Sequence, residues 1–237
     1  GKMFIPNSIL QKPSILTDEE FEIMKTHTTL GYQLCLKDKQ LRPYYAGPYY
    51  HHEALDGTGY PQGLLKKDIP YEAQIIRVAD EFDAIVSKRQ YKSHIGITDS
   101  LKIIIKNTFP SPNAQKNTGY TTAGKNNKLV VKKLISVVID DTEYEIACKM
   151  NYIKFLKQEI NRHKKISDLI KKMNSSTKQI DIDFYKEYIP NFFRNNENFN
   201  NFQQINFEYI EAYKKQKEIL NNLFNEIKKI KKLTKSF

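Results

Sequence analysis

Two adjacent histidines, His51 and His52, stand ahead of the turn sequence Asp-Gly-Thr-Gly-Tyr-Pro at residues 56–61. Imidazole is the side chain that most often binds metal ions in proteins. Consecutive residues of a helix point about 100° apart, so a helical pair of histidines would direct its rings to different neighbours. The pair therefore predicts two metal ions close together, held with the help of ligands from elsewhere in the chain.

A third histidine lies on a predicted helix that begins near residue 17. Thr17 and Glu20 have the spacing of a capping box, and apolar residues follow them at helical spacing. His27 falls beside Met24 on the apolar face of this helix and not on its charged face. His27 is therefore either a core histidine with one hydrogen bond or a metal ligand.

An aspartate, Asp80, lies on the apolar face of another predicted helix, over residues 75–86. Ile76 and Ala84 stand four residues before and after it, which places all three on one side of the helix. A carboxylate is costly to bury unless a cation accompanies it. A metal ion among histidines would supply that cation, and an ion pair with Arg77 or exposure to solvent are the alternatives.

Taken in order, these segments resemble the HD-GYP domain, a branch of the HD metal-dependent phosphohydrolases. The resemblance covers residues 1–110 and rests on Gly-Lys at 1–2, Ile-Pro-Asn-Ser-Ile-Leu at 5–10, the segment 16–28, His-His-Glu at 51–53, the Gly-Tyr-Pro turn and Val-Ala-Asp-Glu-Phe-Asp-Ala at 78–84. It implies a mainly α fold, an HD-domain-like helical bundle. It also implies two or three divalent metal ions, iron or manganese, at the centre of that bundle.

The resemblance also implies an activity and a set of functional residues. The family hydrolyses cyclic di-GMP, a bacterial second messenger, to the linear dinucleotide or GMP, by attack of a metal-bound hydroxide. By this resemblance the metal ligands would be His27, His51, His52 and Asp80. Lys2 would be a catalytic residue that reaches a phosphate oxygen. The substrate-binding residues would be Gly59, Tyr60, Pro61, Arg89 and Lys92.

The chain departs from the family at its first residue. The His-Asp pair that names the family would stand just before Gly1, and it normally supplies a bridging carboxylate and another imidazole. We therefore expect these residues to be a piece of a longer protein, cut after the pair, and we expect the piece alone to be inactive. A smaller departure is at residues 87–94, where Lys88 and Gln90 loosen the match around Arg89.

Two alternatives to a cyclic di-GMP phosphodiesterase stay open at this level. A site that lacks some ligands would make a receptor that binds cyclic di-GMP without hydrolysing it. A related HD hydrolase would act on another nucleotide, although the intact Gly-Tyr-Pro sequence at residues 59–61 argues against this.

Charge is distributed unevenly along the 237 residues, whose net charge is +11. Residues 128–237 carry 22 basic and 14 acidic side chains, so the basic excess belongs to the C-terminal region. It suits an anionic partner or reflects genome composition, and we do not expect nucleic acid to be that partner. The two cysteines fit a reducing compartment, and no apolar run reaches the ~20 residues of a membrane span. We therefore expect a cytoplasmic protein.

The sequence predicts a chain of three regions. Residues 1–110 form the HD-GYP domain, residues 111–127 form a linker rich in Pro, Ser, Asn and Gly, and residues 128–237 form a mostly helical basic extension. Within the extension, β-branched residues on both sides of a polar break predict a β-hairpin over residues 128–149. A helix that starts earlier than residue 150 is the alternative.

The end of the extension is expected to be a long helix from about residue 207 to residue 233. Residues 191–206 hold seven asparagines and predict an irregular loop before it. Leu220, Leu223, Ile227 and Ile230 then repeat at spacings of 3, 4 and 3, which is the spacing of a short heptad seam. The seam predicts either a homodimer through this helix or a helix packed on its own domain.

Overall fold

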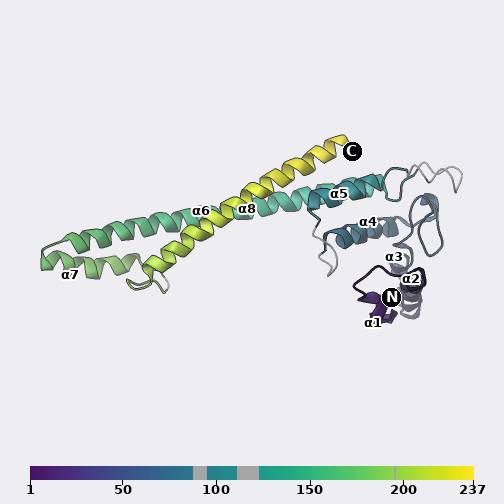
Figure 1. The fold of residues 1–237 in the computed structure, drawn as a ribbon, viewed down its shortest axis with the longest axis horizontal. Helices are drawn as coiled ribbons and strands as arrows, with labels where there is room; N and C mark the ends of the chain where they lie inside the picture. The colour runs from purple at the N-terminus through teal and green to yellow at the C-terminus, as the bar shows by residue number, and fades with distance from the viewer. Residues whose placement is uncertain (88–94, 111–122, 195) are drawn as a thin grey trace. The chain divides into compact units, whose positions relative to one another are not determined.

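The structure is a computed structural model that describes residues 1–87, 95–110, 123–194 and 196–237. The described residues are mainly α-helical, which confirms the predicted fold class (Figure 1). They form two compact units, which are Gly1–Ile139 with Lys229–Phe237, and Asp140–Lys228.

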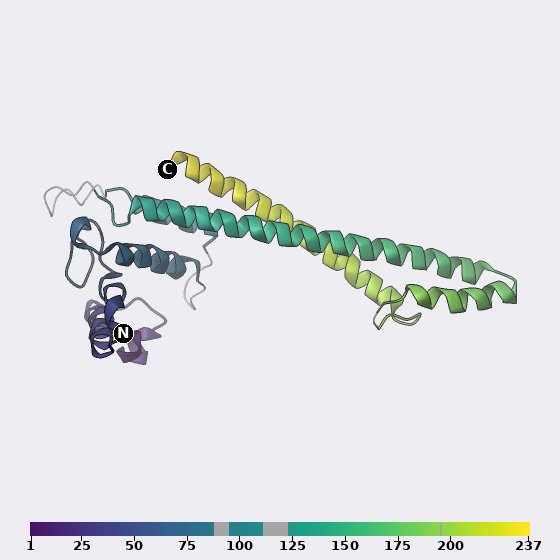
Figure 2. The same cartoon turned by 180° about the vertical axis from the view of Figure 1, so that it is seen from behind.

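The N-terminal unit is built from short and medium-length helices, and α2, α3 and α4 lie close together in it (Figures 1 and 2). Its elements, in chain order, are η1 (Lys2–Phe4), α1 (Asn7–Leu10), α2 (Asp18–Lys37), η2 (Arg42–Tyr44), α3 (Ala46–Tyr50), η3 (Lys66–Asp68), α4 (Tyr71–Val86) and α5 (Ile97–Lys106). The first part of α6 (Lys128–Ser175) and the last residues of α8 (Phe202–Ser236) complete the unit.

The core of this unit lies where α4 and α5 meet the first turns of α6 and the end of α8. Its buried members are Val78, Leu101, Ile104, Val130, Val131, Ile135, Val138 and Ile230. Burying such aliphatic side chains stabilises the fold by about 1.5–3 kcal/mol each. Because Val78 lies on the same helix as Asp80, this core fixes the helix that carries the candidate ligand.

The predicted β-hairpin over residues 128–149 is wrong, because α6 runs through the whole segment as one helix. The buried residues in this stretch include Val131, Ile135, Val138 and Thr142, which repeat every three or four residues and so share one helical face. The β-branched residues favour strands only where a pleated surface is available to pack on. Here the helical period and the contacts with α4 and α5 decide the structure.

The second unit contains the rest of α6, α7 (Gln179–Tyr188), η5 (Ile189–Phe192) and most of α8. Figure 2 shows α7 folding back along the end of α6. Ile166, Ile189 and Phe202 form the buried centre of its cluster. The mostly helical character predicted for the extension is confirmed, and the asparagine-rich loop is shorter than predicted because helix residues occupy both of its ends.

Part of the heptad seam on α8 packs against other residues of the same chain. Ile230 is completely buried in the core of the N-terminal unit. This packing is the one expected if the helix packs on its own domain. The homodimer itself stays a prediction. The described helices include none that is both long enough and apolar enough to cross a membrane.

Candidate metal centre and substrate pocket

His27 is presented by α2, and the start of that helix is as predicted. Glu20 N donates to Thr17 Oγ1 at 3.3 Å, and Thr17 N donates to Glu20 Oε2 at 2.8 Å, which completes the capping box. This cap fixes the register of the helix. As a result His27 lies on the buried face, next to Thr28.

His51 and His52 lie at the end of α3 and not inside a long helix. His51 is the C-cap residue of that short helix and His52 belongs to the turn that follows. The two rings do have different further neighbours, since His51 approaches His27 and His52 stacks on Tyr60, but their centroids are only 4.2 Å apart. The helix ends at this point, and the turn brings both rings to the same side.

The three imidazoles converge into one group. A ligand nitrogen can be chosen on each of His27, His51 and His52 so that the three atoms lie within 4.8 Å of one another. The ring centroid of His27 is 5.3 Å from that of His51 and 5.0 Å from that of His52. Tertiary structure has therefore joined residues that are 24 positions apart in the sequence.

The hydrogen bonds of two of these rings determine which nitrogen is free. His27 Nδ1 lies 2.6 Å from Met24 O, and His51 Nδ1 lies 3.0 Å from both Gly47 O and Pro48 O. Carbonyl oxygens only accept, so each Nδ1 carries the proton and each Nε2 of a neutral ring presents a lone pair. These two Nε2 atoms face each other at 3.3 Å. Two lone pairs that face each other repel, so a cation bound between the two Nε2 atoms would stabilise this arrangement.

Burial keeps these rings neutral. It lowers the pKa of His27 and of His51, and it lowers the pKa of His52 to about 2, with the neighbouring histidines adding to the shift of His51 and His52. A charged imidazolium is disfavoured where water is excluded. Neutral imidazole is the form that binds metal ions, so the environment of the group fits a metal site.

Asp80 and Lys2 line the same cavity as two of the histidines. This cavity has a volume of about 830 Å³ and is bordered by Lys2, His27, His52 and Asp80. Asp80 is half-buried, and it also lines a smaller cavity with His51 and His52. Asp80 thus shares both cavities with the histidines, but it is not part of the group whose ligand atoms lie within 4.8 Å of one another. Lys2 brings a positive charge to the wall of the larger cavity.

The Gly-Tyr-Pro turn is packed directly on His52. The Tyr60 ring stacks on the His52 ring with centroids 4.7 Å apart, and Tyr60 N donates to His52 O at 3.2 Å. Burial and the negative charge of Asp80 raise the pKa of Tyr60 to about 12, so its hydroxyl stays protonated. Pro61 follows through a cis peptide bond.

Two buried carboxylates that the sequence reasoning did not single out hold this turn. Glu53 Oε1 accepts from Gln62 N at 2.6 Å, and Glu53 Oε2 accepts from Leu64 N at 2.8 Å. Asp56 Oδ1 accepts from Thr58 N and from Thr58 Oγ1. The second arrangement is the turn that an aspartate before glycine commonly forms, and that signal is visible in the sequence.

A polar network ties α4 to residues 123–127, the end of the segment predicted to be a linker. Arg77 donates to His52 O at 3.2 Å and to Asn126 Oδ1 at 3.0 Å. Asn126 Nδ2 and Asn107 Nδ2 donate to the two carboxylate oxygens of Glu81. Asn126 is buried. This end of the segment is therefore irregular, as predicted, but it is part of the site.

The hydrogen bonds of Arg77 do not support the alternative in which Arg77 forms an ion pair with Asp80. The described hydrogen bonds of the Arg77 side chain go to the carbonyl of His52 and to Asn126. Burial lowers the pKa of Arg77, and the nearby carboxylate of Glu81 opposes that shift most. The described ion pairs do not include one between Arg77 and Asp80, and Asp80 lines a cavity with His51 and His52.

Replacing Asn126 by alanine should destabilise the N-terminal unit by about 2 kcal/mol, because it leaves buried partners without hydrogen bonds. The measurements are the free energy of unfolding from denaturant titration and hydrogen exchange over residues 51–64. Hydrogen exchange should become faster over residues 51–64, because Arg77 loses the hydrogen bond to Asn126 that holds it beside His52. Asn151→Ala, at an exposed position of α6, is the control. Equal stability and equal exchange in both variants would contradict the role given to Asn126.

Two predicted substrate-binding residues cannot be placed. Arg89 and Lys92 lie outside the described residues, as do Lys88 and Gln90. Of the other predicted site residues, Lys2, His27, His52 and Asp80 border one cavity. His51 joins His52 and Asp80 in a second, and Gly59 and Tyr60 lie beside His52 in a third.

Comparison with known proteins agrees with this geometry. Residues 1–109 match the HD domain family, so this stretch forms an HD domain. A cyclic di-GMP phosphodiesterase of Thermotoga maritima is 50% identical over 97 residues, which are 39% of this chain and 26% of that protein. The cyclic di-GMP phosphodiesterase response regulator RpfG of Xanthomonas campestris is 48% identical over 95 residues, which are 39% of this chain and 25% of that protein.

Another relative is named for a different substrate. A 3'3'-cGAMP-specific phosphodiesterase of Vibrio cholerae is 42% identical over 94 residues, which are 39% of this chain and 18% of that protein. The chain thus spans about a quarter or less of the length of these three relatives. The resemblance expected from the sequence is confirmed for the HD domain, and the activity of the whole protein remains to be proposed.

Proposed function

We propose that the HD domain of this chain belongs to a metal-dependent phosphodiesterase that hydrolyses cyclic di-GMP. Support comes from the match of residues 1–109 to the HD domain and from the names of the relatives. Further support is the cavity of about 830 Å³ between Lys2, His27 and Asp80, which is within the range of small-molecule sites.

In this proposal the metal ligands are His27, His51, His52 and Asp80. The observation that carries the proposal is the 3.3 Å approach of the two unprotonated Nε2 atoms of His27 and His51. A cation placed against both would replace a repulsion by two ligand bonds. Three imidazoles and a carboxylate suit first-row transition ions, and we propose iron or manganese.

The chain's own residues prepare the site for an anionic substrate. Hydrogen bonds from Nδ1 of His27 and His51 to backbone carbonyls hold those rings in place, an arrangement that typically orients metal-binding histidines. Lys2 would pair with a phosphate oxygen of the substrate, because it is a cation on the wall of the same cavity. The protonated hydroxyl of Tyr60 would donate a hydrogen bond beside His52.

Divalent ions, when bound, neutralise charge on phosphate oxygens and make water acidic enough to attack near neutral pH. The residues around them exclude bulk water and fix the orientation of the phosphodiester. Proximity of this kind contributes strongly to hydrolysis of a bond that resists attack by free hydroxide.

The direct test is to measure the metal content and the hydrolysis products of the purified protein, expressed with any native sequence that flanks these residues. We expect bound iron or manganese by elemental analysis, and conversion of cyclic di-GMP to the linear dinucleotide or GMP by chromatography. Chelation should remove both, and added Fe²⁺ or Mn²⁺ should restore both. Binding of cyclic di-GMP without turnover would indicate a receptor, and turnover that survives complete metal removal would refute the proposal.

A further inference from the structure

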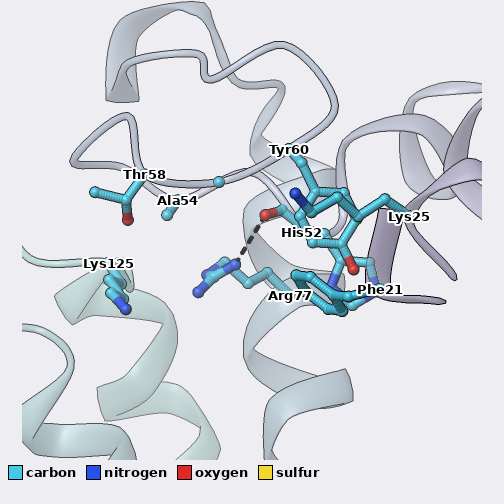
Figure 3. A pocket seen from close by; sticks show the side chains of 9 residues that line it. Phe21, Lys25, His52, Ala54, Thr58, Tyr60, Arg77 and Lys125 are labelled. Atoms are coloured by element: carbon cyan, nitrogen blue, oxygen red, sulfur yellow. Dashed lines mark hydrogen bonds between the residues drawn. The ribbon is translucent and has the colours of Figure 1, made fainter. Parts of the chain in front are cut away.

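A second pocket opens beside the histidine group, and the proposed function has so far assigned roles only to its lining residues His52, Gly59 and Tyr60. It has a volume of about 380 Å³ and shares His52 and Phe21 with the cavity of about 830 Å³ that contains Lys2 and Asp80. Figure 3 shows Arg77 in this pocket, with Lys125 on one side and Phe21 and His52 on the other. A dinucleotide held at the metal ligands could therefore extend one of its halves into this space.

The pocket is rich in hydrogen-bond donors. Lys25, Arg77 and Lys125 line it, and its described lining includes no carboxylate. Lys25 Nζ is engaged with Glu22 at 2.6 Å and lies 4.9 Å from the centroid of the Phe21 ring. Arg77 is engaged with His52 O and Asn126. Lys125 is exposed, and the described ion pairs do not include it.

The backbone of Lys125 is held firmly although its side chain is free to meet a ligand. Leu55 N donates to Lys125 O at 3.0 Å, and the next residue, Asn126, donates its N–H to Asn107 O at 3.0 Å. A lysine on such an anchored stretch has fewer conformations to lose on binding than one on a mobile loop. The tertiary fold thus places its ammonium group at the rim of the pocket.

We infer that this pocket binds one guanine base of a cyclic dinucleotide and that Lys125 is a specificity-determining residue. The inference rests on the proposed function, because it assigns a base to a substrate of the same site. Guanine presents two acceptors, N7 and O6, on one edge, whereas adenine presents an acceptor and the amino donor N6 there. A lining of cationic donors without a carboxylate pairs with the first edge and opposes the second.

The walls of the pocket favour a base over a phosphate. Phe21 and Tyr60 supply aromatic surface, and 42% of Phe21 is exposed. Bases stack or pack against such rings, whereas a phosphate gains nothing from them. Lys2 and the candidate metal ligands, which suit the phosphate, line the neighbouring cavity.

The experiment compares equilibrium binding of cyclic di-GMP and cyclic di-AMP by calorimetry, independently of turnover, and it uses the protein expressed with any native sequence that flanks these residues. The unmodified protein should prefer cyclic di-GMP by roughly tenfold or more, the size expected of a well-paired base contact. Lys125→Ala should remove most of this preference and Lys125→Glu should shift it further toward adenine, since a carboxylate accepts from N6. Lys125→Arg should keep it.

The controls separate this inference from the proposed function. Lys67→Ala removes an exposed lysine that does not line the pocket, and it should leave the preference unchanged. Metal content should be equal in all variants. If Lys125→Ala weakens both ligands by the same factor, Lys125 meets a phosphate and the base assignment is overturned. If the unmodified protein hydrolyses cyclic di-GMP but binds both dinucleotides equally, the inference fails while the proposed function stands. If it binds neither dinucleotide, both fail.

Discussion

Replacing His52 by alanine should abolish metal binding and hydrolysis together, and Asp80→Asn should do the same. His52 is the histidine that lines all three cavities of the site, and Asp80 is the candidate carboxylate ligand that lines two of them. Loss of a ligand costs more than loss of a residue that merely supports one, for which tenfold to 100-fold losses are typical. We therefore expect activity to fall by more than about 100-fold and metal content to fall toward zero.

The measurement is elemental analysis on the same samples that are assayed for cyclic di-GMP turnover. Asp83→Asn is the matched control, because Asp83 is an exposed carboxylate on the same helix as Asp80. Its described hydrogen bond, from Ser87 Oγ at 3.0 Å, can be kept by an amide oxygen. If His52→Ala and Asp80→Asn retain the metal content of Asp83→Asn, the ligand assignment is wrong.

The second large effect is expected at Gly59, where the substitution to alanine should destabilise the protein by about 2–4 kcal/mol. A Cβ atom at this position would lie 2.2 Å from Ala54 N and 2.5 Å from both Glu53 Cα and His52 O. All three atoms belong to the backbone, so no flexible side chain can move aside. The turn must shift, and the stacking of Tyr60 on His52 must shift with it.

Gly59→Ala should therefore lower metal affinity as well as the free energy of unfolding, and denaturant titration and metal titration measure the two effects. Gly96→Ala is the control, because a Cβ atom there would meet nothing within 4 Å, and it should change stability by less than about 1 kcal/mol. A Gly59→Ala protein as stable as the Gly96→Ala protein would show that the turn does not depend on this close approach.

The local elements of the site could be read from the sequence where local chemistry specifies them. Thr17 and Glu20 predict the start of α2 because a capping box involves only residues within one turn. The placement of His27 on the buried face follows from the same register. The predicted helix around Asp80 is also present, although α4 begins earlier, at Tyr71.

Predictions failed where long-range packing decides between local preferences. The β-branched residues of the segment 128–149 favour a strand locally, but the contacts of Val131 and Ile135 with the core select the helix. The relative direction of His51 and His52 depends on where α3 ends.

Sequence alone determined which side chains of this protein are available for the site: three histidines, an aspartate and a glycine-rich turn in a recognisable order. Only the tertiary structure decided that His27 meets His51 with lone pairs facing at 3.3 Å, that Asn126 accepts from Arg77, and that Lys125 lines the pocket beside Arg77. The reason is physical. Ligand type and turn chemistry are properties of single residues and their neighbours, whereas convergence depends on the packing of helices that are distant in the chain.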